Sequence, residues 1–269
     1  ITGPLADSFP SPGHRLIFDG IDRVEVPPRN PKDKLKSWYR PKFEISGEPN
    51  ISTSLQRLAS RASRRPVTQV AVAPYVDLFH SERQGGASTE DALLTASAAI
   101  LCAPEFLYLK ELPGPLDDHA LASRLSYFLT RSLPDTALLE DAKQGTVASN
   151  LASHTERLLS SKHADRFITD FTDAWLDLRE IDFTNPDEKL FPEFDGYLKW
   201  SMIEETRAFF RHLIEANLPV TNLIKSDFAF LNERLAKHYQ IHGIEGAHLR
   251  KVQLEPDSPR GGVLSQAAI

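Results

Sequence analysis

The sequence predicts a mainly α-helical protein, an irregular helical bundle that follows a short, proline-rich, β-like N-terminal segment. Beyond about residue 51 the apolar residues recur three and four positions apart, as they do on the buried face of an amphipathic helix. Before residue 51, prolines, glycines and short runs such as Val24-Glu25-Val26 favour strand ends and irregular chain. No internal repeat is present, which disfavours a solenoid.

Composition narrows the class of protein. The chain has 269 residues, 41% hydrophobic and 25% charged, which is typical of globular proteins and allows one large or two modest domains. Its net charge of −6 argues against a dedicated nucleic-acid binder, which usually carries a basic excess. Uncharged apolar stretches such as Thr95–Pro104 are far too short to cross a bilayer, so we expect no membrane span.

We expect three segments along the chain. Residues 1–50 are predicted to be a linker or the remnant of a preceding β domain, residues 51–112 a small helical domain, and residues 113–269 a larger helical domain, truncated at its C-terminal end. The first residue is not methionine, no signal-peptide core follows it, and the last residues begin an apolar helical pattern. We therefore expect this chain to be a piece of a longer protein.

Local signals predict the elements in order. Pro66 ends the first helix, whose apolar stripe begins at Leu55, and Ser88 is the start signal of the next. Asp117 is a favourable N-cap residue. Leu121 is also placed to form a hydrophobic staple with the residue before the cap. The predicted strands are 15–18 and 24–26, and the predicted helices are 52–65, 88–101, 104–107, 117–129, 151–159, 167–178, 195–216 and 231–239.

The longest predicted helix, 195–216, carries an acidic residue where the pattern is apolar. At about 100° per residue, Glu205 falls beside Leu198 on one apolar arc that also includes Phe209, and His212 borders that arc. A carboxylate buried there must be paired or protonated, because an unpaired buried charge costs several kcal/mol.

Two interpretations of Glu205 follow. It is an acid, base or metal ligand in a cleft, or it is the structural partner of an arginine such as Arg124 or Arg166. We rank the structural interpretation first, since structural ion pairs are the commoner cause of such placements. A second apolar arc, which includes Trp200 and Phe210, predicts that this helix is buried on two sides.

Histidine and cysteine residues offer little metal or redox chemistry. His238 and His242 have the spacing that places two imidazoles on one helical face, but Gly243 indicates that the helix has already ended. The single cysteine, Cys102, excludes an internal disulfide and a CxxC-type haem or metal site in these residues. Its apolar neighbours predict a buried, inert thiol. We therefore predict no metal or cofactor site within the chain.

Two further features have a functional and a structural interpretation. The basic run Arg61–Arg65 is a phosphate or acidic-partner site, or, as we prefer, a set of cations at a helix C-terminus. The pair Gly261-Gly262 is an anion pocket or, more simply, a turn that enters a helix. Walker, nucleophile-elbow and dinucleotide-binding motifs are absent from the sequence.

Several strings resemble a known family pair. The larger pattern resembles domain of unknown function 1592, frequent in planctomycetes, and it is carried by residues 116–129, 133–135, 170–171, 175–176, 190–192, 204–206, 230–236 and 260–264. Residues 62–68 and 103–108 resemble domain of unknown function 1595, a smaller helical domain that usually precedes it. The chain departs from the pattern at Thr130, where tryptophan is common, at Cys102, where serine is common, and at Gln240, where glycine is usual.

The resemblance implies context rather than mechanism. Such proteins are large, exported and multidomain, with a periplasmic or extracellular location and often a c-type cytochrome domain in flanking sequence. Neighbouring domains of the same polypeptide are then the expected partners, and any c-type haem belongs to flanking sequence. The family supplies no catalytic residues to carry over.

Two functional hypotheses remain. The first is a helical scaffold or interaction module of an exported multidomain protein of unknown activity, whether or not that protein is linked to haem. The alternative is part of a periplasmic redox enzyme that acts on an organic or carbohydrate substrate, with its site completed by other domains. Whether the chain is an enzyme is left open, and the candidate catalytic residues are Glu205, Asp227 and His212, with Trp175 and Trp200 as aromatic contributors.

Overall fold

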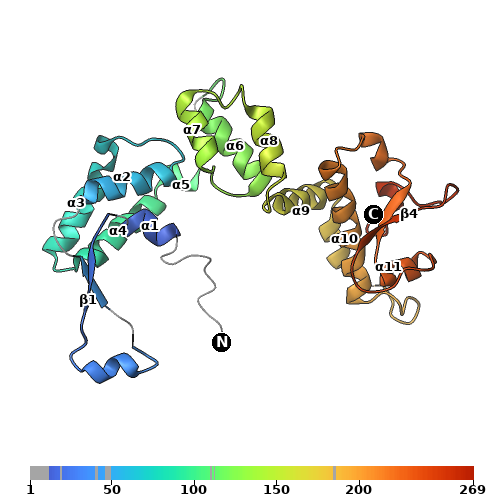
Figure 1. Ribbon diagram of the computed structural model, residues 1–269, viewed down its shortest axis with the longest axis horizontal. Coiled ribbons are helices and arrows are strands. Elements are labelled where there is room, and N and C mark those ends of the chain that lie inside the picture. Colours follow the sequence, from blue (N-terminus) through green and yellow to red (C-terminus); the bar gives the residue numbers. More distant parts are fainter. Residues whose placement is uncertain are drawn as a thin grey trace. The chain divides into compact units, whose positions relative to one another are not determined.

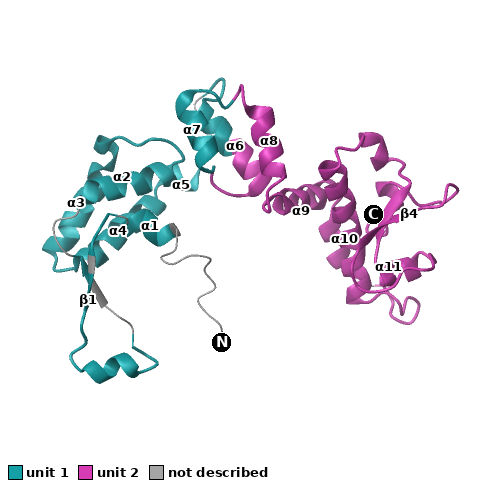
Figure 2. Ribbon diagram, in the orientation of Figure 1, with its two compact units in different colours: residues 1–123, 134–147 teal, residues 124–133, 148–269 magenta. Residues whose placement is uncertain are grey.

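The computed structural model describes residues 12–18, 20–39, 42–45, 50–109, 111, 113–183 and 186–269, and it is mainly helical, with short strands (Figure 1). The predicted fold class, mainly α with a short β-containing N-terminal region, is confirmed. The chain divides into two compact units (Figure 2): residues 1–123 with 134–147, and residues 124–133 with 148–269. Within the described ranges, no helix is long and apolar enough to span a bilayer.

The first unit contains a helical core and a two-stranded antiparallel sheet in which Val24 faces Glu44. Helices α2, α3 and α4 pack together, and Leu55, Val72 and Leu93 lie in their shared core. In order, its elements are α1 (Pro12–Phe18), β1 (Arg23–Val26), 3-10 helix η1 (Pro31–Leu35), β2 (Lys42–Ile45), α2 (Ile51–Ala62), α3 (Gln69–Gln84), α4 (Thr89–Leu101), α5 (Pro104–Leu107), the start of α6 (Asp118–Thr130), and α7 (Thr136–Gln144).

The N-terminal prediction is half right. Residues 24–26 form a strand as predicted, but residues 15–18 are the end of helix α1 and not a strand. Tertiary packing decides this segment, because Phe18 is buried in the core of the first unit and Leu16 packs against that core. Residues 1–11 of the predicted linker lie outside the described residues.

Side-chain caps explain where the predicted helices of the first unit begin. The side chain of Ser88 accepts a hydrogen bond from the Asp91 amide at the start of α4, and Asp117 accepts one from the Ala120 amide at the start of α6. Besides α1, the helices α3 and α7 were not predicted from the sequence. Each has a side-chain cap, Thr68 for α3 and Asp135 for α7.

The second unit is built on the long helix α10. In order, its elements are the end of α6, α8 (Leu151–Leu159), α9 (Ala164–Trp175), 3-10 helix η2 (Leu178–Phe183), α10 (Gly196–Glu215), 3-10 helix η3 (Val220–Leu223), β3 (Phe228–Leu231), α11 (Glu233–His238), β4 (Arg250–Gln253), and 3-10 helix η4 (Val263–Ser265). Helix α10 packs against α9, α11 and β3.

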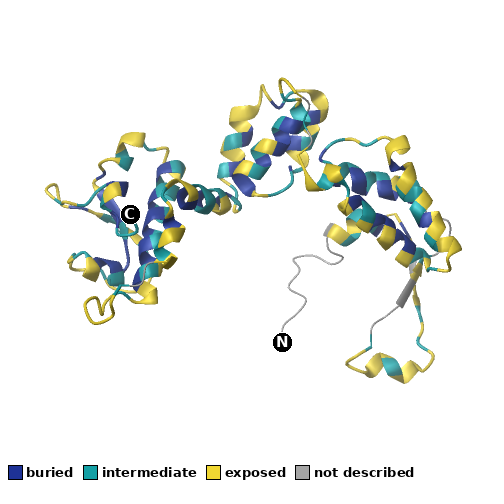
Figure 3. Cartoon of the chain, turned by 180° about the vertical axis from the view of Figure 1, so that it is seen from behind, coloured by how far each residue is buried: buried dark blue, intermediate teal, exposed yellow. Residues whose placement is uncertain are grey.

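The first apolar arc of α10 is confirmed, since Leu198 and Phe209 are fully buried. The second arc is not: Phe210 is only partly buried and Trp200 is 47% exposed. Helix α10 therefore has one buried face and one partly wet face, as the burial colouring in Figure 3 shows for the helices of this unit.

The antiparallel pairing of strands β3 and β4 was not predicted. Phe228 faces Gln253 and Leu231 faces Arg250 across the pair. The predicted helix 231–239 is therefore shorter than expected: Leu231 lies in β3, Asn232 caps α11, and the helix ends at His238. The alternation of apolar residues in four-residue strands is too brief to separate them from helix starts.

Candidate functional site

Glu205 is sealed inside the second unit. Its side chain is 1% exposed, on the face of α10 that also buries Leu198 and Phe209. The sequence pattern therefore placed this carboxyl correctly. Burial of a carboxyl removes its hydration, so the surrounding groups must supply hydrogen bonds or keep it protonated.

A tyrosine supplies the main hydrogen bond. The hydroxyl of Tyr239, the residue after α11, donates to Oε2 of Glu205 at 2.5 Å. The same hydroxyl accepts a hydrogen bond from the backbone amide of Ala267 at 2.7 Å. We call this chain of Ala267, Tyr239 and Glu205 the Glu205 lock, because it fastens the C-terminal segment to α10 and α11.

Arg260 packs against the ring of Tyr239, the central residue of the Glu205 lock. Its guanidinium carbon lies 3.9 Å from the centroid of the Tyr239 ring, a distance at which a cation is attracted by the ring. Its Nη1 donates to the carbonyl oxygen of Ser265 at 2.6 Å. Arg260 therefore joins the aromatic ring to the C-terminal segment.

The environment moves two pKa values in the same direction. Burial raises the pKa of Glu205 to about 7, although the Tyr239 hydrogen bond, the Ala267 amide and the charge of Arg260 each lower it in part. Burial and then the charge of Glu205 raise the pKa of the Tyr239 phenol far above its usual range. Tyr239 therefore keeps its proton, while Glu205 changes charge close to neutral pH.

The arginines suggested as partners of Glu205 do not fill that role. Arg166 donates to the backbone carbonyl of Thr130 at 3.0 Å. The cation whose charge acts on the Glu205 carboxyl is Arg260, and Arg124 does not contribute. The hydrogen-bond donor to Glu205 is therefore a tyrosine and not one of the arginines suggested from the sequence.

The glycine pair beside Arg260 is explained by close packing. Gly261 has φ +132°, and an added Cβ would lie 2.3 Å from the carbonyl oxygen of Ser226. Gly262 has φ +98°, and its added Cβ would lie 2.3 Å from the carbonyl oxygen of Ile224. The Gly261 amide donates to Ser265 Oγ at 2.9 Å, so it is used within the turn. The pair is the close-packed turn of our preferred interpretation.

His212 has separate surroundings on the same helix. The Nζ of Lys251 on β4 lies 3.0 Å from its Nε2 and 4.3 Å from the centroid of the Phe228 ring. The His212 ring meets Phe228 edge-on at 5.2 Å. Burial and then the charge of Lys251 lower the pKa of His212, which favours a neutral imidazole that accepts from the lysine. Because its partners come from β3 and β4, His212 does not join the Glu205 lock.

The remaining candidates are also apart. Asp227 is exposed just before β3, where its backbone carbonyl accepts from the Leu254 amide at 2.7 Å. Trp175 packs against Phe171 at the end of α9, and Trp200 stacks on Tyr197 at 5.8 Å. These contacts give each residue a packing role, and none of them is with Glu205.

His238 and Cys102 complete the list of sequence candidates. Helix α11 ends at His238, so His242 lies beyond it and the two imidazoles do not share a helical face. The prediction of a buried thiol is wrong, because Cys102 is exposed. Cys102 directly follows α4, where the chain leaves the helix and the apolar neighbours no longer enclose the side chain.

The basic run divides into residues with different roles. Helix α2 ends at Ala62, which confirms that Arg61 lies in the last turn of a helix. Arg64, with φ +60°, is only 5% exposed and donates to the backbone carbonyls of Glu105, Phe106 and Tyr108. These are carbonyls at the end of α5, so Arg64 caps that helix.

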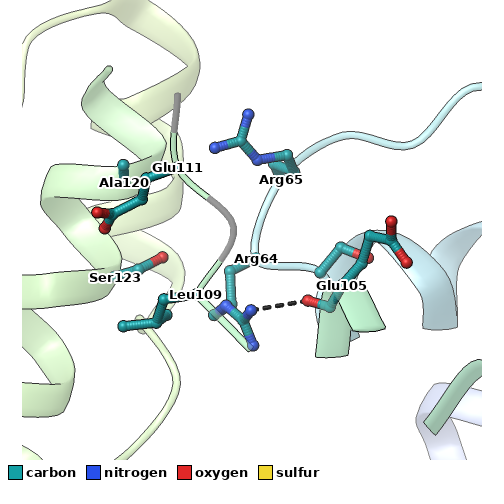
Figure 4. Close-up of a pocket in the computed structure, with 8 residues that line it drawn as sticks. Arg64, Arg65, Glu105, Leu109, Glu111, Ala120 and Ser123 are labelled. Carbon is teal, nitrogen blue, oxygen red and sulfur yellow. Dashed lines mark hydrogen bonds between the residues drawn. The ribbon is translucent and has the colours of Figure 1, made fainter. Parts of the chain in front are cut away.

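A cavity of about 310 Å³ lies beside this arginine, within the first unit. In Figure 4 the Arg64 guanidinium reaches the backbone of Glu105, and Glu111 and Ser123 line the facing wall. Because Arg64 is held by backbone carbonyls, its role here is to join α5 to the end of α2.

Sequence reasoning missed Tyr239 and Arg260. Tyr239 lies 34 residues beyond Glu205 in the chain, and helical periodicity does not relate residues so far apart. One signal was present: a carboxyl predicted to be buried needs a donor, and a tyrosine at the end of an apolar helix is a suitable one. Its identity needed the fold.

Comparison with known families agrees with the resemblance. Residues 51–111 match the family described as Protein of unknown function (DUF1595), and residues 116–241 match the family described as Protein of unknown function (DUF1592). Both families and their order were predicted. The planctomycete and cytochrome associations stay predictions. No curated protein and no solved structure matches the chain.

Proposed function

Since the chain carries a DUF1595 domain followed by a DUF1592 domain, we propose that it is a helical scaffold or interaction module of a larger, exported multidomain protein. The observation that carries this proposal is the Glu205 lock. Its acid is 1% exposed and is bonded to a tyrosine that also binds the C-terminal segment. A group enclosed in this way joins segments of the chain, because a substrate has no access to it.

The alternative, a periplasmic redox enzyme, gains no support from the geometry. An active site needs its acid, base and binding groups within hydrogen-bond reach of one substrate. Glu205, His212 and Trp200 each have different neighbours, and Asp227 is exposed elsewhere. The proposed partners are therefore the neighbouring domains of the same polypeptide, in a periplasmic or extracellular location that rests on the resemblance.

Covalent haem does not fit this chain. A c-type haem is attached through two cysteines in a CxxCH motif, and the sequence has a single cysteine, Cys102. Any haem that the resemblance implies would be attached to other sequence.

The scaffold proposal predicts slow amide exchange at Ala267. Because the Ala267 amide is bonded to the buried Tyr239 hydroxyl, we expect it to exchange only when the second unit unfolds. Hydrogen exchange followed by NMR measures this directly, with the amide of Gly243, in the exposed loop after α11, as a fast-exchanging reference. Exchange of Ala267 through frequent local opening, at a much lower free energy than global unfolding, would show an accessible site and contradict the proposal.

The lock also predicts a pH dependence of stability. The unfolded carboxyl loses its proton near pH 4.5, whereas the folded carboxyl keeps it until about pH 7. The folded state therefore binds more protons in this window, and the free energy of unfolding falls as the pH rises, by about 3 kcal/mol in all. Urea unfolding followed by circular dichroism at a series of pH values measures this slope.

Glu205→Gln should remove the slope, because the amide remains neutral and its oxygen still accepts from Tyr239. The variant should match the wild type near pH 5 and exceed it in stability near pH 8. Glu215→Gln on the same helix is the matched control, since Glu215 is exposed and should leave the slope unchanged. A slope that persists in Glu205→Gln would rule out Glu205 as its source.

A further inference from the structure

A second cavity in the first unit gathers cations. Its volume is about 370 Å³, within the range typical of small-molecule sites. We call it the basic cavity, and the ionisable side chains that line it are Arg57, Arg61, Arg65, His119, Glu140 and Lys143. They come from α2 and the residues after it, the first turn of α6, and α7. Although the chain has a net charge of −6, cations outnumber carboxylates in the lining of this pocket.

The charges of the basic cavity are only partly balanced. Lys143 pairs with Glu140 at 2.6 Å, and Arg65 pairs with Asp117 at 3.2 Å. Arg61 instead donates to the backbone carbonyl of Pro134 at 2.7 Å, and no carboxylate of the described residues lies within ion-pair distance of it. A carbonyl orients the guanidinium without neutralising it, so Arg61 keeps a full positive charge at the cavity wall.

His119 provides an independent sign of a ligand. Its Nδ1 is buried and lacks a hydrogen-bond partner within the described part of the chain. Burial and then the charge of Arg65 lower the pKa of this histidine, and a hydrogen bond to the backbone of Arg64 opposes that effect. Buried polar nitrogens are normally satisfied, so this one indicates a missing partner, and in the protonated ring it would donate to an anionic oxygen.

The other walls decide what kind of anion fits. Leu16, Pro66 and Leu139 line the same cavity and offer apolar surface. A bare inorganic ion would leave this surface wet, whereas a ligand with an apolar body would cover it. The first cavity differs, because its buried Arg64 is already bound to backbone carbonyls.

We propose that the basic cavity binds a small organic anion, a carboxylate or phosphate monoester on a compact apolar body, with the anionic group at Arg61 and His119 and the body against Leu16 and Leu139. This is a binding activity, separate from the scaffold role of the second unit and independent of the Glu205 lock.

The test is calorimetric titration of the whole 269-residue chain with phenyl phosphate. We expect saturable binding with a Kd of about 1 mM or tighter, as a ligand of this size allows. Arg61→Gln should weaken it by about tenfold or more, since a hydrogen bond to a charged group is lost. Arg83→Gln is the matched control: Arg83 also donates to one backbone carbonyl, that of Ala87, but it does not line the cavity.

Three further ligands test separately the need for the anionic group and the need for the apolar body. Benzoate should bind as phenyl phosphate does, while phenol, which lacks the charge, and inorganic phosphate, which lacks the body, should each bind more weakly. Equal binding of phenol would overturn the role of the cations, and equal binding of inorganic phosphate would overturn the role of the apolar walls. No saturable heat with phenyl phosphate or benzoate, or equal weakening by Arg61→Gln and Arg83→Gln, would overturn the site.

A measurement on the wild-type chain covers the case in which Arg61→Gln does not fold. The NMR titration of the His119 ring gives its pKa with and without saturating phenyl phosphate. A bound anion stabilises the imidazolium, so the pKa of His119 should rise on binding, while that of His212, which does not line the cavity, should not change. An unchanged pKa for His119 at saturation would place the anion elsewhere and contradict the proposal.

Discussion

Gly262→Ala is expected to destabilise the second unit by at least about 3 kcal/mol, the range reached when a core is overpacked and the backbone must shift. An added Cβ would lie 2.3 Å from the carbonyl oxygen of Ile224 and 2.9 Å from that of Leu223. Both obstacles are backbone atoms, so no side-chain rotation relieves the clash. The backbone of Gly262, with φ +98° and ψ 163°, lies in a region used almost only by glycine, which adds a cost of about 1–3 kcal/mol for an L-residue. Urea unfolding followed by circular dichroism measures the loss.

Gly243→Ala is the matched control for this variant. Gly243 has φ +82°, but an added Cβ would meet nothing within 4 Å. Its variant should therefore lose only the conformational cost of about 1 kcal/mol. The difference between the two variants measures the close approach of the turn to the loop before β3, together with the more restricted backbone conformation of Gly262. If Gly262→Ala were no worse than Gly243→Ala, the turn would not be closely packed in solution.

Arg64→Met is expected to cost the first unit about 3 kcal/mol or more. The guanidinium donates to the carbonyls of Glu105, Phe106 and Tyr108 at 2.7 to 3.0 Å, and it is 5% exposed. Hydrogen bonds from a charged donor contribute about 1.5–3 kcal/mol each, and all three carbonyls would lose this donor. Methionine keeps most of the aliphatic stem, so the loss comes mainly from the hydrogen bonds. Thermal and urea unfolding measure it.

Arg83→Met supplies the comparison. Arg83 is exposed at the end of α3 and donates to one backbone carbonyl, so its replacement should change stability by no more than about 0.5 kcal/mol. Were Arg64→Met as mild as Arg83→Met, the carbonyls at the end of α5 would be satisfied by water, and Arg64 would not be their cap.

Helices with a strong cap and a clean apolar stripe could be predicted from the sequence. Asp195, which caps α10 by accepting from the Leu198 amide, is one example, and Ser88 at α4 is another. Helix α3 could not, because Pro74 lies inside it and β-branched valines lower its helix propensity. Tertiary contacts overcome both, since α3 packs against α2 and α4.

The candidate site, too, could be predicted from the sequence only in part. The burial of Glu205 follows from periodicity within one helix, so the sequence alone could place it. Its partners, Tyr239 and Ala267, come from segments whose approach depends on the β3–β4 pair and on the glycine turn. Local pattern contains no information about such distant contacts. The exposure of Cys102 was missed for a related reason, since it depends on how the chain leaves α4.

That exposed thiol makes the two units separately observable. A maleimide dye would attach to Cys102 alone, at the end of a helix whose Leu93 lies in the core of the first unit. The intrinsic fluorescence of the chain comes largely from elsewhere, because two of its three tryptophans, Trp175 and Trp200, belong to the second unit. Dye emission therefore reports the first unit and tryptophan emission mainly the second, so one denaturation experiment resolves whether the two units unfold together or in turn.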